Sequence, residues 1–411
     1  MNGKLKKLIL FYVLMLSVIL SQVGMSVYIT ALNWRVIEFS NSAFHIGVIA
    51  TSMTLPQFLF SLMGGAIADN KDKLRSLRLI LVLQIIVACA FSLISSKLSF
   101  NFIVTYAISF LIGTLNAIWQ PVFLSYIPML IPQTYVPMGM SLSLVGLYAS
   151  RFLGPMWAGW LLKSFSPSTP FFVYCYSILI PLLMFFLIKL PSSIAETENK
   201  DLKKTFQPDV LIKDKIILPL WLITIALSLF IMSIFSIIPY FAKNVFGLDS
   251  SGMSKLMSSC GLGQLIGAVL SMAIGKRNET RFGRNQYQGY VLMGFFLLIF
   301  AISSNVIIAI SSLMLMNVIH GVLSPRINTI IQTYVPESMR GKVQSMFLLV
   351  FGFVPFGQFL LGLITTPSAP RLGAIVYVVM FFLTLLVVRL KFDKLLQLQQ
   401  ENGAIRLKND A

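Results

Sequence analysis

Twelve long runs of apolar residues divide this chain of 411 residues, and they constrain its fold more than any other feature. Each run is near or above the roughly 20 residues that an α-helix needs to cross a hydrocarbon core about 30 Å thick. Only 11% of the residues are charged, against about 25% in soluble domains. The sequence therefore predicts an all-α membrane protein with twelve transmembrane helices. The runs cover residues 8–36, 43–67, 75–95, 100–126, 137–163, 171–190, 216–242, 253–275, 287–303, 305–331, 342–365 and 372–390.

One polar insert separates the sixth run from the seventh. Residues 191–215 hold several Glu, Asp and Lys side chains, whereas the other loops are short. We interpret this segment as a linker between two six-helix bundles, residues 1–190 and 216–391. Residues 392–411 are then expected to form a cytoplasmic tail.

An internal repeat supports this division. The stretch QTYVP occurs at 133–137 and again at 332–336, but a looser match at an offset of 204 residues is longer. It aligns Asn116 with His320, each followed by a small residue, and it aligns Gln120 with Ser324, each followed by proline. We interpret the exact five-residue match as a coincidence. The looser match indicates a duplication of six helices, which predicts pseudo-symmetric halves. Two related halves with a central loop are typical of transporters.

Basic residues predict the orientation in the membrane. If both termini are cytoplasmic, most of the 32 Lys and Arg residues lie on that side. Basic loops stay in the cytoplasm, so this distribution favours termini inside. It also explains the net charge of +18 without nucleic acid as a partner. The opposite side carries only Lys97, Lys163, Lys243, Lys255 and Arg371.

The patterns that mark metal sites, cofactor sites and enzymes do not occur in the sequence. Its three cysteines, Cys89, Cys175 and Cys260, lie in apolar runs with no neighbouring His/Cys cluster. The two histidines, His45 and His320, belong to different halves, and there is no phosphate-binding Gly-x-x-x-x-Gly-Lys motif. We expect no metal, no cofactor and no enzymatic activity.

Three motifs resemble the major facilitator superfamily, in particular its macrolide-efflux and enterobactin-exporter branch. One is a glycine-led helix end followed by Asp and basic residues, the second is Arg-x-x-Gly-Pro-x-x-x-Gly in the fifth run, and the third lies in the loop between the tenth and eleventh runs. The resemblance covers essentially the whole chain and implies transport rather than catalysis. The motif residues are Gly65, Asp69 and Arg75, then Arg151, Gly154, Pro155 and Gly159, then Arg340 and Gly341.

The resemblance implies a gating role for these motifs. Asp69 is expected to cap helix N-termini or to pair with Arg75 in a latch that opens during transport. In the fifth run, Gly146, Ser150, Gly154 and Ala158 recur every four residues, so this face can approach another helix closely. Such a face suits a moving seam between the halves, and static packing is the alternative. Pro155 is expected to kink this helix.

The family's first, fourth, seventh and tenth helices face a central cavity, which locates the expected substrate site. Polar residues in these runs are costly in a membrane unless they line a wet cavity or bond to neighbouring helices. Both interpretations stay open at this point. The candidates are Gln22, Asn116, Trp119, Gln120, Asn317, His320, Ser324 and Arg326.

Arg151 and Arg326 are charged residues within the apolar runs, with no acidic residue at comparable depth in their own halves. Either guanidinium could bind an anionic substrate through paired hydrogen bonds. For Arg151 a structural role is also expected, in which it bonds carbonyls freed at Pro155. For Arg326 we expect a role in substrate binding or coupling.

Proton coupling is implied by the resemblance, although the usual buried carboxylate is absent. The remaining candidates for protonation are His320, Glu38 and Asp69, and Glu38 is expected to pair with Arg35 three residues earlier. The sequence thus predicts a secondary transporter in a bacterial inner membrane that exports a medium-sized amphiphile, such as a siderophore or a drug. An importer of a related solute and a lipid flippase are the alternatives. Its expected partners are a small-molecule substrate and the bilayer, and a monomer suffices.

Overall fold

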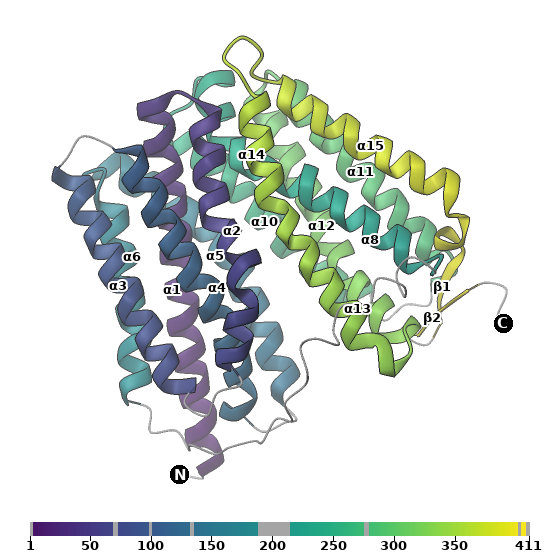
Figure 1. The fold of residues 1–411 in the computed structure, drawn as a ribbon, viewed down its shortest axis with the longest axis horizontal. Helices are drawn as coiled ribbons and strands as arrows, with labels where there is room; N and C mark the ends of the chain where they lie inside the picture. Colours follow the sequence, from purple (N-terminus) through teal and green to yellow (C-terminus); the bar gives the residue numbers. More distant parts are fainter. Residues whose placement is uncertain are drawn as a thin grey trace. The chain divides into compact units, whose positions relative to one another are not determined.

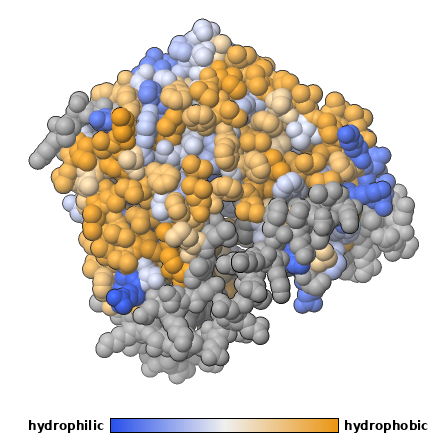
Figure 2. All heavy atoms as spheres, viewed as in Figure 1, coloured by the Kyte–Doolittle hydropathy of each residue, from blue (hydrophilic) through white to orange (hydrophobic). Residues whose placement is uncertain are grey.

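The computed structural model describes residues 3–68, 73–97, 101–131, 135–187, 214–274, 279–401 and 404–407, and most of them are helical (Figure 1). Within these ranges, eleven helices are long and apolar enough to cross a membrane. A further helix, α5, is also of spanning length at 29 residues. Figure 2 shows apolar side chains over most of the helical surface in view, as expected of a surface that faces lipid. The predicted all-α membrane fold is confirmed.

The chain divides into two compact units. The first comprises Met1–Glu198 and Gly247–Ser258, and the second comprises Asn199–Phe246 and Ser259–Ala411. Most of the expected linker lies outside the described residues, so the scheme of bundles at 1–190 and 216–391 stays a prediction.

The first unit contains six long helices. α1 and α2 are joined by Asn41, which adopts the left-handed conformation with φ of 47°. Asn101 caps α4, because its side chain accepts hydrogen bonds from the backbone N–H groups of Ile103 and Val104. α2 packs along α4, and α1 packs against α5 and α6. The bounds are α1 Gly3–Ser40, α2 Ala43–Ala68, α3 Lys73–Lys97, α4 Phe102–Leu130, α5 Val136–Ser164 and α6 Thr169–Leu187.

The second unit has the remaining spans. Asn305 caps α12 through the N–H groups of Ile307 and Ile308, as Asn101 caps α4. The two caps are 204 residues apart, the same offset as the sequence repeat. The helices are α8 Ile217–Ala226, α9 Ile238–Tyr240, α10 Ser250–Ile274, α11 Phe282–Ile302, α12 Val306–Tyr334, α13 Glu337–Leu349, α14 Val354–Ile364 and α15 Leu372–Lys391. The residues of α10 up to Ser258 group with the first unit.

The first span of this unit, Ile217–Val245, departs from α-helical geometry in its middle. Two π-helical segments, η3 (Leu227–Ile231) and η5 (Phe241–Val245), flank a 3₁₀ segment, η4 (Met232–Ile237), and α9. The Ser233 hydroxyl donates to the carbonyls of Ser228 and Val354, each at 3.1 Å. Irregular helical turns often occur at functional positions, so this span is a candidate moving element.

Small residues bring helices together inside each unit. A Cβ atom on Gly154 of α5 would lie 2.2 Å from Cβ of Ser26 in α1. Likewise, a Cβ atom on Gly267 of α10 would lie 2.2 Å from the carbonyl oxygen of Val318 in α12. The small-residue face of α5 therefore packs within its own unit at Gly154, and Ala158 lies in the same cluster as Val23 of α1. These contacts support the static-packing interpretation for this face.

Further secondary structure follows α15, in the region that was predicted to form a cytoplasmic tail. A 3₁₀ turn, η7 (Asp393–Gln397), follows α15, and β1 (Leu398–Glu401) pairs with β2 (Ala404–Leu407) in an antiparallel hairpin. A short 3₁₀ segment, η6 (Val350–Phe353), joins α13 to α14.

Candidate functional site

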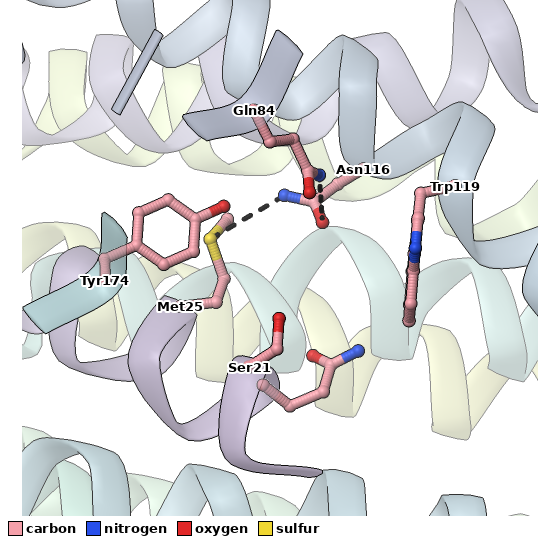
Figure 3. Close-up of a pocket in the computed structure, with 7 residues that line it drawn as sticks. Ser21, Met25, Gln84, Asn116, Trp119 and Tyr174 are labelled. Carbon is pink, nitrogen blue, oxygen red and sulfur yellow. Dashed lines mark hydrogen bonds between the residues drawn. The ribbon is translucent and has the colours of Figure 1, made fainter. Parts of the chain in front are cut away.

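A small polar pocket lies inside the first unit, between α1, α3, α4 and α6 (Figure 3). The cavity is about 10 Å³, which is room for roughly one water molecule. A whole amphiphile is therefore too large for this cavity. The lining residues are Ser21, Gln22, Met25, Gln84, Asn116, Trp119 and Tyr174.

Asn116 lines this pocket and contacts other residues of its lining. Its side-chain oxygen accepts from Gln84 Nε2 at 3.4 Å, and its Nδ2 donates to the sulfur of Met25 at 3.7 Å. Figure 3 shows both contacts converging on the one amide. An N–H···O hydrogen bond is ordinarily 2.7 to 3.2 Å long, so the contact between Gln84 and Asn116 is a long one.

Trp119 forms the aromatic wall on the other side of the pocket. Its side chain is 5% exposed and stacks on Phe123 with a centroid distance of 4.9 Å. The buried indole N–H has no hydrogen-bond acceptor among the described residues. Tryptophan N–H groups usually find a partner when buried, so this wall also has an unused donor.

The pocket is uncharged. All seven lining side chains are neutral, and six of them carry an amide, a hydroxyl group or an indole N–H, Met25 being the exception. Such a lining suits a hydroxyl, carbonyl or amide group, since an isolated ion would not be compensated there.

The structure brings together three of the predicted cavity residues, Gln22, Asn116 and Trp119. Gln120, predicted with them, is exposed and does not line the pocket. Sequence reasoning missed Ser21, Met25, Gln84 and Tyr174. Of these, Gln84 had a signal, because it is an amide inside the apolar third run.

The predicted candidates of the second unit are arranged differently. Asn317 is fully buried, accepts a hydrogen bond from Gln264 Nε2 at 3.1 Å and donates to the carbonyl of Leu313 at 2.8 Å. These bonds support the interhelical alternative for Asn317 rather than cavity lining. His320 and Ser324 are half-buried on the same helix.

Arg326 has an acidic partner, so the expectation that it lacks one is wrong. Its Nη2 forms an ion pair with Glu279, and its guanidinium lies 4.5 Å above the ring of Phe282. Sequence reasoning assigned Glu279 to a loop away from the apolar runs. Glu279 does lie outside the helices, three positions before α11, and its side chain meets Arg326 of α12 there.

The family model of the Major Facilitator Superfamily matches residues 14–359. The chain belongs to this superfamily. The chain is a transporter rather than an enzyme, as predicted. The seventh span, with its π and 3₁₀ turns, and the polar pocket therefore belong to a transporter.

Known relatives agree with the family assignment. The chain is 24% identical over 380 residues to the staphyloferrin A transporter of Staphylococcus aureus (strain NCTC 8325 / PS 47), covering 88% of this chain and 93% of that protein. Among solved structures, a bacterial homolog of the human lysosomal transporter Spinster is 14% identical with a TM-score of 0.72 over 96% of this chain and 99% of that one. A D-xylose–proton symporter is also 14% identical, with a TM-score of 0.70 over 95% and 98%. The two solved structures show the fold.

The superfamily motif residues of the first unit belong to α2, α3 and α5 or lie outside the described residues. Gly65 lies in α2, Arg75 is exposed in α3, and Asp69 lies outside the described residues, so the latch stays a prediction. Arg151 is exposed on α5, one turn before Pro155. Gly159 lies against Ser254, in the α10 segment that groups with the first unit.

The remaining motif and coupling candidates have simple local contacts. Arg340 Nε donates to the carbonyl of Val335 at 3.1 Å, which fixes the start of α13. Gly341 is exposed, and nothing lies within 4 Å of the position of a Cβ atom. The predicted pairing of Arg35 with Glu38 is confirmed at 3.1 Å.

Proposed function

We propose that this superfamily member is a secondary active transporter that exports a medium-sized amphiphile of the siderophore or drug class. The observation that carries this proposal is the similarity to a staphyloferrin A transporter along 88% of the chain. A siderophore is a polar small molecule with many hydrogen-bonding groups. The uncharged pocket supports the proposal because it is lined by amide groups and offers an indole N–H that has no acceptor among the described residues.

In this proposal the pocket of the first unit binds one terminal group of the substrate. Asn116 and Gln84 provide the amide contacts, and Trp119 provides an apolar wall. Alternating access then carries the bound molecule across the membrane, as in other transporters built from related halves. A proton gradient supplies the energy, and His320 is the coupling candidate, since Glu38 is paired with Arg35.

We place the transporter in the inner membrane of a bacterium, with both termini in the cytoplasm and one chain as the working unit. The distribution of basic residues between alternate loops supports this orientation.

Gene deletion tests the proposal directly. Culture supernatant and cell extract of the wild type and the deletion strain are compared by mass spectrometry, with and without iron starvation. Export predicts a small molecule that disappears from the supernatant and accumulates in the cells. Complementation with the intact gene is the control and should reverse both changes.

The same experiment separates the alternatives. A molecule that builds up outside the deletion strain would make the protein an importer. Unchanged small molecules together with altered lipid distribution between the leaflets would favour a flippase and would contradict the proposed substrate class.

A further inference from the structure

Residues 393–401 and 404–407 fold back onto the second unit, and we call these residues the strap. It consists of η7, β1 and β2, which lie beside the start of α11 (Figure 1). Three of its apolar side chains are buried, with exposed fractions of 1% for Leu395, 0% for Leu398 and 3% for Ile405. A free extension would leave these residues in water, so the strap is a docked element.

Gly283, in the first turn of α11, allows the strap to lie directly against this helix. A Cβ atom at position 283 would be 1.9 Å from the carbonyl oxygen of Leu395 and 3.1 Å from Cβ of Leu398. The first distance is too short for any real contact, so a side chain here would displace the strap.

Backbone hydrogen bonds tie the strap to two neighbours. Glu279 N–H donates to the Gln400 carbonyl at 2.8 Å, and Gln400 N–H donates to the Glu279 carbonyl at 2.9 Å. On the other strand, Ile405 N–H donates to Oγ1 of Thr333 in α12 at 3.3 Å. The strap therefore joins Glu279, three residues before α11, to the end of α12.

These bonds fix Glu279 where its carboxylate meets Arg326. One carboxylate oxygen forms the ion pair with Arg326, and the other accepts from Nδ2 of Asn285. The side chains of Arg326 and Glu279 are only 12% and 18% exposed. In such a shielded pair, loss of one partner leaves the other charge uncompensated.

We propose that the strap is a positioning element that holds Glu279 as the counter-ion of Arg326. While the strap is docked, Glu279 neutralises the guanidinium, which is then not offered to an anionic ligand. When the strap is displaced, Glu279 loses both backbone anchors and the pair weakens. The inference goes beyond the proposed function, because it does not depend on the molecule that is carried.

A double-mutant cycle separates this positioning role from general packing. Gly283→Ala displaces the strap with one methyl group, and Glu279→Gln removes the charge while keeping the shape. Thermal unfolding of the purified full-length protein in detergent is the measurement. We expect each variant to lower the unfolding midpoint by several degrees, and the double variant to fall no further than the lower single variant.

Two features make this cycle decisive. Alanine has a higher helix propensity than glycine, so Gly283→Ala would raise the midpoint if the strap contact did not matter. Asp393→Asn is the matched control, since Asp393 is an exposed strap carboxylate with no ion pair to a described residue. It should leave the midpoint unchanged.

Several outcomes would overturn the proposal. Additive shifts for Gly283→Ala and Glu279→Gln would show that the strap stabilises the unit by packing alone, and an unchanged midpoint for Gly283→Ala would show that docking is unimportant. A chain ending at Phe392 gives a second test, because Glu279→Gln should then have no additional effect. No substrate is used, so a negative export result leaves this test intact.

Discussion

Gln264 of α10 donates a 3.1 Å hydrogen bond to Asn317 of α12, and their exposed fractions are only 2% and 0%. Asn317→Ala removes the acceptor and leaves a cavity in the second unit. We expect a loss of about 1 to 2 kcal/mol in stability, because interhelical hydrogen bonds in membranes contribute about this much. The thermal midpoint of purified protein measures the loss. The matched control is Asn328→Ala, an exposed asparagine on the same helix that bonds Gln344, and it should shift the midpoint little.

The pocket of the first unit predicts a change in substrate affinity. Asn116→Ala removes an amide from the lining of the pocket, so KM for the exported molecule should rise about threefold to tenfold while the maximal rate changes less. Uptake into inverted vesicles at varied substrate concentrations measures both quantities. Gln120→Ala is the control, since this neighbouring amide is exposed and outside the pocket. Equal effects of both substitutions would contradict the assignment of the pocket.

The close contact between α5 and α1 predicts that Gly154→Val prevents folding. The added Cβ alone would lie 2.2 Å from Cβ of Ser26, and the helices would have to separate. We expect little folded protein in membranes, as measured by fluorescence-detected size-exclusion chromatography. Gly341→Val is the matched motif glycine and should accumulate normally, because no atom lies within 4 Å of its Cβ position. A normal level of Gly154→Val would show that the contact can relax.

The coupling hypothesis predicts that His320→Ala loses gradient-driven transport but keeps exchange of substrate across the membrane. The physical reason is that histidine titrates near neutral pH, whereas alanine carries no proton. Transport into proteoliposomes, with and without a pH gradient, distinguishes the two activities. The chain's other histidine is the control: His45 contacts Tyr106 and stacks on Phe102 at 4.2 Å, so His45→Gln should keep coupling. Gradient-driven transport in His320→Ala at normal membrane levels would refute the hypothesis.

Much of the fold follows from the sequence because membrane spans are long and apolar. The bilayer requires every backbone polar group to be bonded within its helix, so length and hydropathy decide the architecture. The duplication was also readable, and the caps Asn101 and Asn305 support it at the same offset of 204 residues. Neither cap was identified from the sequence, although an asparagine before an apolar run is a known start signal.

The site was only partly predictable. Helical spacing places Asn116, Trp119 and Gln120 on one side of the helix. Spacing alone cannot show that Asn116 lines the pocket whereas Gln120, one turn later, is exposed. The partner of Arg326 was missed because it comes from outside the apolar runs. Docking of the strap forms backbone hydrogen bonds between Gln400 and Glu279, which are far apart in sequence, and Glu279 pairs with the guanidinium. The residues next to Glu279 and Arg326 in the sequence do not indicate such a contact.

The neutrality of the pocket has an electrical consequence. Moving one elementary charge across a membrane potential of 100 mV involves about 2.3 kcal/mol of work. The seven pocket side chains carry no charge, so reorienting this site from one face of the membrane to the other involves no such work. Any voltage dependence of transport must therefore arise from the substrate, from a bound proton, or from the few charged residues within the spans.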